Sequence, residues 1–430
     1  MRRIASSLWL AWLSLLPLAA QSTPPRPQVP ATAAASWVDA DGESGEECTI
    51  GVACGRATAD GRPLLWKNRD AQKHDNVVTA FQDGKTPYLG LCDAGAKGSV
   101  WGGANAAGFC ILNSVSRDLP QGSTKGPGNG SFMKLALQRC TTVADFERLL
   151  EETNDNGRRT RANFAVLDAH GGAAMFETAH KTFRRFDAKD AANGIVLRTN
   201  FATTGKGDRG RDRLARADAI CKSLPKGSPL DPSLVLDRIC RDLQPPAVAE
   251  QGAPDHLDVR ETIHRQTTVA AMVFHGCKDN EDPRFTTMWA VLGQPLFSVA
   301  VPCWPAAGAP APTVAGNPRS PLCDAAIQLQ NVFYEHPAPA AEPTKDANAG
   351  DAEAGAAAAS TAAEAEVAGA NRWLLTADLP GVRKLLEPVE RSILAATKDQ
   401  MAQWRAAKEP PSSEAMRQFH LLQADAAAAQ

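Results

Sequence analysis

The sequence has 430 residues, of which 43% are hydrophobic and 22% are charged, and its formal net charge is −2. This length allows one large domain with extensions or two ordinary domains, and the composition allows a sizeable hydrophobic core. A nucleic-acid-binding protein typically has a basic surface, so the even charge balance argues against a nucleic-acid partner.

The N-terminal residues 1–20 have the pattern of a secretory signal peptide. Two arginines precede an apolar run that ends in Ala19-Ala20, and such a run between a basic start and small residues favours cleavage. An uncleaved anchor is the alternative, because the run approaches the length of a membrane span. We expect a secreted or periplasmic protein with no stable membrane insertion after signal removal. Residues 21–47, first rich in Pro and Ala and then acidic, are predicted to be a propeptide or linker.

The stretch from Cys48 to Asp70 carries the candidate chemistry. Its apolar residues 49–53 predict a buried strand, Asp60-Gly61 predicts a tight turn, and residues 63–66 predict the return strand. The return strand would bring two cations and a carboxylate beside the thiol, and a nearby cation raises the thiolate fraction of a cysteine. The residues delivered in this way are Lys67, Asn68, Arg69 and Asp70.

Further strands are predicted to end in polar residues. A turn at residues 105–108 precedes a strand that ends at Asn113, and a strand over residues 194–200 ends at Asn200. A helix is predicted to begin at Asp212 and to contain Arg213. Other predicted elements are a helix over 142–153, a hairpin over 163–177, and strands over 267–274, 285–292 and 296–302.

These motifs resemble the Ntn (N-terminal nucleophile) hydrolases of the choloylglycine hydrolase, penicillin acyltransferase and acid-ceramidase-like group. That family has an N-terminal Cys-Thr, here Cys48-Thr49, then an Asp-Gly turn and an Arg-Asn-x-Asp element. The element reads Lys-Asn-Arg-Asp over residues 67–70, so a lysine replaces the arginine. The Asn-x-x-Gly turn with its following strand and the Thr199-Asn200 strand end also resemble family motifs.

The resemblance implies an α/β (α+β) fold, the four-layer αββα sandwich, and a cysteine nucleophile freed by cleavage before Cys48. It implies hydrolysis of a linear non-peptide amide in a small-molecule substrate, through a thioester, with no cofactor and no metal ion. The implied catalytic residues are Cys48, Asp70, Asn113, Asn200 and Arg213, and the implied substrate-binding residues are Lys67, Asn68 and Arg69.

Three alternatives remain open from the sequence. The same scaffold can serve an acyltransferase or a dipeptidase, and a papain-like peptidase could use an internal cysteine with His275. A non-catalytic secreted binding domain would place Cys48 in a disulfide, as is usual in exported proteins. If Cys48 is the nucleophile, the remaining nine of the ten cysteines cannot all pair. The sequence indicates no oligomeric state.

The proposed domain order places the amidohydrolase domain at residues 48–304. Residues 305–370 are predicted to be a Pro/Ala-rich linker and low-complexity segment, and residues 371–430 a C-terminal helical extension. Within the extension we expect a short helix over 379–386 and a second helix that starts at Pro388 and packs on the main domain.

Overall fold

The computed structural model describes residues 47–122, 125–224, 229–244, 256–316, 319–334 and 373–429. The predicted signal peptide, the propeptide up to residue 46 and the low-complexity segment over 335–370 lie outside the described residues. All predicted site residues lie inside them. No helix in the described part of the chain is long and apolar enough to cross a membrane.

Two antiparallel sheets form the centre of the molecule. The first sheet has the strand order β10-β1-β2-β12-β13-β14. Its strands are β1 (Glu47–Ala53), β2 (Leu64–Asp70), β10 (Ile195–Arg198), β12 (Thr268–His275), β13 (Thr287–Leu292) and β14 (Val301–Cys303). The second sheet follows chain order from β3 to β9. Its strands are β3 (Asn76–Phe81), β4 (Tyr88–Asp93), β5 (Gly102–Asn105), β6 (Cys110–Val115), β7 (Ala162–Leu167), β8 (Ala173–Thr178) and β9 (Phe183–Asp187).

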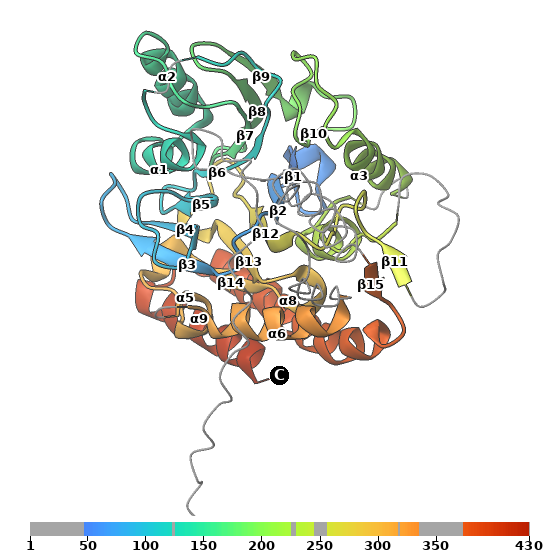
Figure 1. Ribbon diagram of the computed structural model, residues 1–430. Coiled ribbons are helices and arrows are strands. Elements are labelled where there is room, and N and C mark those ends of the chain that lie inside the picture. Colours follow the sequence, from blue (N-terminus) through green and yellow to red (C-terminus); the bar gives the residue numbers. More distant parts are fainter. Residues whose placement is uncertain are drawn as a thin grey trace, which may run out of the picture. The chain divides into compact units, whose positions relative to one another are not determined.

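The two sheets pack face to face and helices cover their outer faces (Figure 1). Strands β1 and β2 of the first sheet contact β6 and β7 of the second. Helices α1 (Asn129–Arg139) and α2 (Val143–Asn154) cover the second sheet, and α3 (Arg211–Ser223), α6 (Pro321–Phe333), α8 (Leu379–Ala406) and α9 (Ser413–Ala428) lie on the side of the first. The predicted four-layer αββα sandwich is therefore confirmed.

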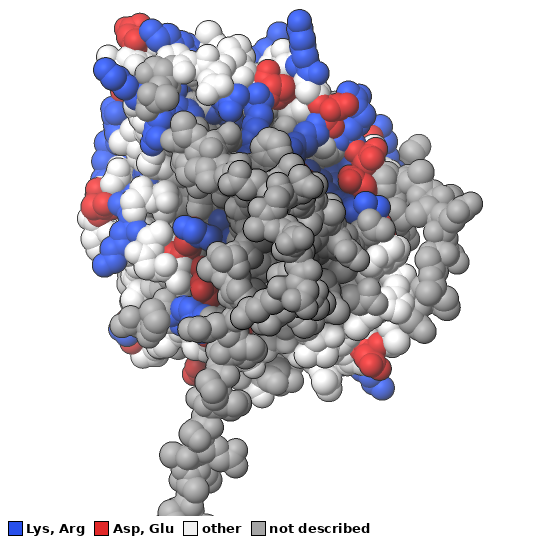
Figure 2. All heavy atoms as spheres, viewed as in Figure 1, with Lys and Arg blue, Asp and Glu red and all other residues white. Residues whose placement is uncertain are grey.

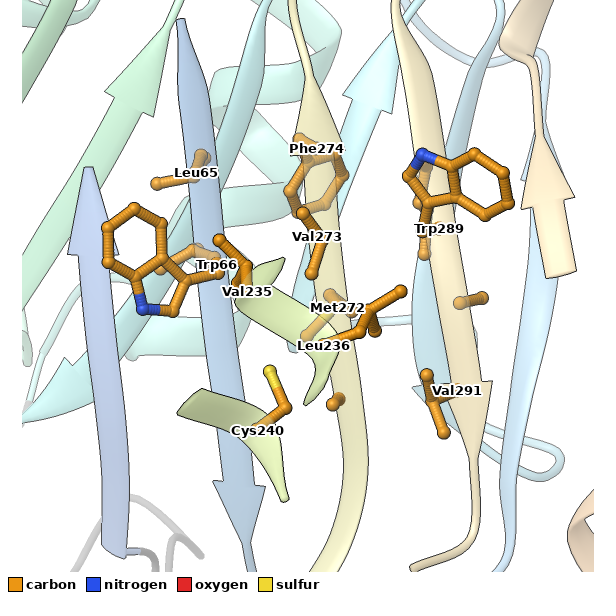
Figure 3. Packing of buried hydrophobic residues seen from close by; sticks show 14 of the residues in the cluster. Leu65, Trp66, Val235, Leu236, Cys240, Met272, Val273, Phe274, Trp289 and Val291 are labelled. Atoms are coloured by element: carbon orange, nitrogen blue, oxygen red, sulfur yellow. The ribbon is translucent and has the colours of Figure 1, made fainter. Parts of the chain in front are cut away.

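On the face of the first sheet that meets the helical elements, buried side chains pack closely around β2 (Figure 3). The six-residue helical turn η3 (Val235–Cys240) lays Val235 and Leu236 against Trp66 and Val273. Burying one such side chain stabilises the fold by about 1.5–3 kcal/mol. Gly51 lies opposite Trp66 in the β1–β2 register, and a Cβ at Gly51 would lie 2.1 Å from the indole ring. Only glycine leaves room for this packing.

The β1–β2 pair differs from the tight hairpin that the sequence predicted. Strand β1 ends at Ala53 and β2 begins at Leu64, so a longer connection replaces the two-residue turn. Gly61 in that connection has a φ of 78°, a conformation that glycine tolerates best. Strand β2 does not stop at Trp66 but continues to Asp70, which decides where the four residues after Trp66 point.

The C-terminal region also differs in part from the expectation. One helix, α8, runs through Pro388, where the sequence predicted the start of a second helix, although an interior proline removes one backbone donor. On the next turn Glu390 is buried and receives a bidentate pair from Arg241, with distances of 2.8 and 2.7 Å. The predicted 305–370 linker contains helix α6, and the predicted strand at 296–302 holds a helical turn followed by β14.

The C-terminal helices pack on the first sheet, as expected. Helix α9 contacts β14 and α8 contacts α9. Trp404 of α8 and Phe419 of α9 both pack against Trp304, with ring centroids 5.9 and 6.0 Å away. On the surface, Lys and Arg side chains are interspersed with Asp and Glu side chains in the described part of the view in Figure 2.

Candidate active site

Cys48 is fully buried near the start of β1, and polar side chains hold its backbone on both sides. Its N–H donates to Asn200 Oδ1 at 2.9 Å, and its carbonyl accepts from Arg213 Nη1 at 2.9 Å. Arg213 Nη2 also donates to Asn200 Oδ1 at 2.9 Å. The structure therefore brings together Cys48, Asn200 and Arg213, which are separated by up to 165 residues in the chain.

Strand alternation divides the residues of β2 between two faces. Cys48 pairs with Arg69, and Ile50 with Lys67, so Arg69 and Lys67 share the inter-sheet face with Cys48. Asn68 and Asp70 point to the helical side. Asn68, predicted to bind substrate, donates instead to the carbonyl of Cys240 at 2.9 Å, which makes it a structural contact between β2 and η3.

Arg69 is held within the inter-sheet layer. Its guanidinium donates to Asn76 Oδ1 at 3.1 Å and to Asp93 Oδ1 at 3.2 Å, and it lies 4.4 Å from the centroid of the Trp101 ring. These contacts tie β2 to β3 and β4. Arg69 is therefore engaged with protein groups between the two sheets.

Lys67 makes a buried contact with Asn113. Its ammonium donates to Asn113 Oδ1 at 2.9 Å and to the Trp101 carbonyl at 3.1 Å. Asn113 Nδ2 is buried and has no hydrogen-bond partner among the described residues. Because Lys67 can only donate, it fixes the amide of Asn113 with the oxygen toward itself and the NH₂ group available elsewhere. An unpaired buried donor of this kind is costly to maintain.

Asp70 is fully buried beside the same strand end. It accepts from Thr268 Oγ1 at 2.7 Å, and its second oxygen lies 3.7 Å from Arg265 Nε. Burial raises the pKa of Asp70 to about 6, although Arg265 and Arg213 act in the opposite direction. Asp70 Oδ2 has no hydrogen-bond partner among the described residues, so an acceptor is available next to Glu47, with which Asp70 pairs across the strands.

The site also contains Glu47, Arg209 and Arg265, for which the sequence predicted no role in the site. The Glu47 carboxylate contacts Arg209, Arg213 and Arg265, which we call the arginine cluster. No role was predicted for Arg209, because its segment contains several arginines, and none was predicted for Arg265. The only sequence feature that singles out Glu47 is its place at the acidic end of the predicted propeptide. Ion pairs between residues more than 160 positions apart leave no local pattern.

The loop after β10 is anchored by two acidic side chains. Asp118 accepts from the N–H groups of Ala202 and Gly207, at 3.1 and 3.0 Å. Glu177 accepts from the N–H groups of Thr203 and Thr204, at 2.7 and 2.9 Å. Asn200 itself lies just beyond β10, and its Nδ2 donates to the carbonyl of Val115 at 3.1 Å. These bonds fix its Oδ1 toward Cys48.

The structure bears on two alternative readings of Cys48, its pairing with His275 and its place in a disulfide. His275 pairs with Leu64, at the opposite end of β2 from Arg69 and Cys48. Five residues of strand correspond to about 17 Å, so His275 is out of reach of that thiol. His275 instead lies 3.0 Å from Asp60. The structure records no disulfide among the ten cysteines, all of which lie in its described part.

The other buried thiols are poor candidates for chemistry. Burial raises the pKa of eight of them, to about 11 for Cys277 and about 12 for Cys303. Cys48 lies close enough to the Arg213 guanidinium for an electrostatic interaction between the two. Among the residues that the structure describes, no group of three His, Cys, Asp or Glu side chains is arranged to hold a metal ion.

No family model and no curated protein matches the sequence. Solved structures similar to the chain include a Caenorhabditis elegans N-acylethanolamine-hydrolyzing acid amidase ortholog, with 16% identity over 53% of this chain and 92% of that one and a TM-score of 0.38. Penicillin V acylase from Agrobacterium tumefaciens matches with 16% identity over 60% and 85%, at a TM-score of 0.37. A variant of conjugated bile acid hydrolase from Clostridium perfringens matches with 13% identity over 56% and 89%, at 0.36.

At these scores the functional argument rests on the geometry around Cys48 and not on the likeness. The strand order, the packed sheets and the helical layers come from the chain's own coordinates. The described residues thus form a four-layer αββα sandwich with a buried cysteine near the start of an inner strand.

Proposed function

We propose that this protein is a cysteine amidohydrolase of the Ntn type. It cleaves a linear amide C–N bond in a small molecule and becomes active when the peptide bond between Glu47 and Cys48 is cut. The observation that carries this proposal is the hydrogen bond from the Cys48 backbone nitrogen to Asn200 Oδ1 at 2.9 Å, in a buried polar site. That nitrogen is an amide in the uncut chain and becomes a basic α-amine after cleavage.

The α-amine supplies the base that the thiol needs. An α-amino group has an ordinary pKa of about 7.7–8.0, so part of it is neutral near pH 7. It takes the proton from Cys48 Sγ, which bonds to the carbonyl carbon of the substrate. The C–N bond then breaks and the proton passes to the leaving amine. Water adds to the thioester, releases the carboxylic acid and restores the thiol. Two acceptors are suited to orient the amine, Asn200 Oδ1 and Asp70 Oδ2, the latter having no hydrogen-bond partner among the described residues.

Asn113 is suited to stabilise the oxyanion. Its Nδ2 is buried without a partner in the described part of the chain, while Lys67 holds its oxygen. A donor that is fixed before the reaction contributes roughly 10²–10³ to the rate. Asn200 was expected to share this role, but its Oδ1 faces Cys48 and its Nδ2 is bonded to Val115. We therefore assign Asn200 to the amine and Asn113 to the oxyanion.

Export completes the proposal. The basic start and apolar run of residues 1–20 support a signal peptide. Signal removal would leave residues 21–47 ahead of Cys48, so a second cut is needed for activity. The mature enzyme would then act in the periplasm or outside the cell.

A substrate panel tests the activity. Protein that begins at Cys48 is incubated with bile-salt conjugates, acylated amino acids, β-lactams and β-alanyl amides, and the released amine is quantified by mass spectrometry. The same protein, quenched early, is examined for an acyl group on the peptide that contains Cys48. We expect turnover of at least one amide class and a Cys48-linked acyl group. A folded protein with the correct N-terminus that neither turns over nor becomes acylated would contradict the proposal, and Cys48→Ala is the matched control.

A further inference from the structure

The arginine cluster holds the Glu47 carboxylate next to the candidate nucleophile. Arg209 Nε donates to Glu47 Oε1 at 2.7 Å, and Arg213 Nη2 donates to Oε2 at 3.1 Å. Arg265 also contacts Oε2. Arg213 is fully buried and the side chain of Arg265 is 12% exposed, so at least two of the three cations are largely withdrawn from water.

Among the described residues, Glu47 is the carboxylate that contacts all three arginines of the cluster. Burial alone would raise the pKa of Glu47, but Arg265, Arg213 and Arg209 together lower it below its ordinary value. Two further carboxylates lie near Arg265, the buried Asp70 at 3.7 Å and the exposed Glu261 at 3.9 Å. Cleavage before Cys48 removes Glu47 and leaves the three arginines without the carboxylate that they share, with Asp70 near Arg265 and Arg213 only. A buried cation without a partner is costly, so the vacated position favours another anion.

The place of Glu47 in the chain indicates which half of a substrate would carry that anion. Glu47 is the acyl half of the bond that must break before Cys48, and its carbonyl carbon is bonded to the Cys48 nitrogen. Its side chain therefore stands in for a substituent on an acyl group at the nucleophile. Arg213 connects the two positions, because it donates both to Glu47 and to the Cys48 carbonyl.

We propose that, once Glu47 has left, the arginine cluster binds a carboxylate on the acyl half of the substrate. The substrate class is then the monoamides of dicarboxylic acids of about the length of glutarate, which matches a glutamyl side chain. This inference rests on the proposed function, because it concerns the substrate of the same nucleophile.

The test compares two substrates that differ only in charge. Glutaryl-p-nitroanilide carries the carboxylate, and glutaramyl-p-nitroanilide replaces it by a neutral amide of the same shape. For protein that begins at Cys48 we expect kcat/KM to be about 10- to 100-fold higher for the glutaryl compound, the range for hydrogen bonds to a charged group. Arg265→Gln should bring this ratio to within about threefold of unity.

Arg211→Gln is the matched control. Arg211 lies on the same segment as Arg213 but is exposed and stacks 5.7 Å from the centroid of the Phe201 ring. The ratio should be unchanged in this variant. A second measurement needs no turnover: glutaramate should protect Cys48 from alkylation by iodoacetamide at a lower concentration than the neutral glutaramide does, and Arg265→Gln should remove the difference.

The outcomes separate the two proposals. Equal hydrolysis of both anilides would overturn the carboxylate subsite while the amidase activity stands. Selective protection by glutaramate without hydrolysis of either anilide would support the subsite and count against the amidase activity. Equal protection by both compounds, with no hydrolysis, would overturn the subsite as well.

Discussion

Replacing Asp70 by asparagine should stabilise the uncut chain at neutral pH while it abolishes activity. Asp70 is fully buried, and burial raises its pKa to about 6 despite Arg265 and Arg213. Asparagine has nearly the same shape and can still accept the bond from Thr268 Oγ1, which spans 2.7 Å in the wild-type chain. The change therefore removes the charge and little else.

The size and sign of the effect follow from the pKa. An unfolded aspartate titrates near 3.9, so a shift of about two units corresponds to about 3 kcal/mol. The folded chain holds the proton more tightly, so Asp70 lowers the free energy of unfolding as the pH rises from about 4 to about 6. Below pH 4 the wild type and Asp70→Asn should be similar. Above pH 6 the variant should be more stable by about 3 kcal/mol.

The assay is urea unfolding between pH 4 and pH 7, with both chains in a Cys48→Ala background so that neither is cut. The difference between the two chains cancels the titration of every other group. Asp93→Asn is the control, because it replaces a buried carboxylate on β4 of the second sheet that contacts Arg69. A difference that does not change with pH would refute the reasoning. A wild type that gains stability relative to the variant as pH rises would show that the arginines outweigh burial.

Asn113→Ala should lower turnover at least about tenfold, through the loss of an oxyanion donor, in a protein that still folds by circular dichroism. Asn200→Ala should lower turnover as much and also change the pH dependence of kcat/KM, because it contacts the nitrogen of Cys48; a plain loss of stability would leave that profile unchanged. Lys67→Gln should retain more activity than Lys67→Met, since only glutamine can still donate to Asn113; equal kcat values would contradict this. Thiol titration of the mature protein should reveal one fast-reacting thiol that Cys48→Ala lacks, because the α-amine formed by cleavage serves as a base for Cys48 alone; several fast thiols would disagree.

Local patterns predicted much of this fold. Alternating and continuous apolar runs located β1, β7 and β8 within a few residues, and helical spacing located α2 at Val143–Asn154. Motif resemblance selected Cys48, Asn113, Asn200 and Arg213, and the structure places the first, third and fourth in direct contact. These successes share one cause, since each signal lies within a short stretch of sequence.

The differences have the opposite cause. Asn68 lies on the helical face because β2 continues past Trp66 as a strand. The length of β2 depends in turn on its pairing with β12, more than 190 residues further along the chain. The arginine cluster assembles around Glu47 from segments that the sequence keeps far apart. Likewise α8 continues through Pro388, and its Glu390 pairs with Arg241 on another element. Such contacts are tertiary and leave no periodic pattern.

The most direct test of the account is the N-terminal residue of the active protein. While Glu47 is attached, the Cys48 nitrogen is an amide that donates to Asn200 and has no usable basicity. Active protein, purified from a full-length gene and separated from inactive chains, should therefore begin at Cys48 by intact mass and N-terminal sequencing. The Cys48→Ala chain should be inactive. Full amidase activity from a chain that still carries Glu47 would contradict the central claim.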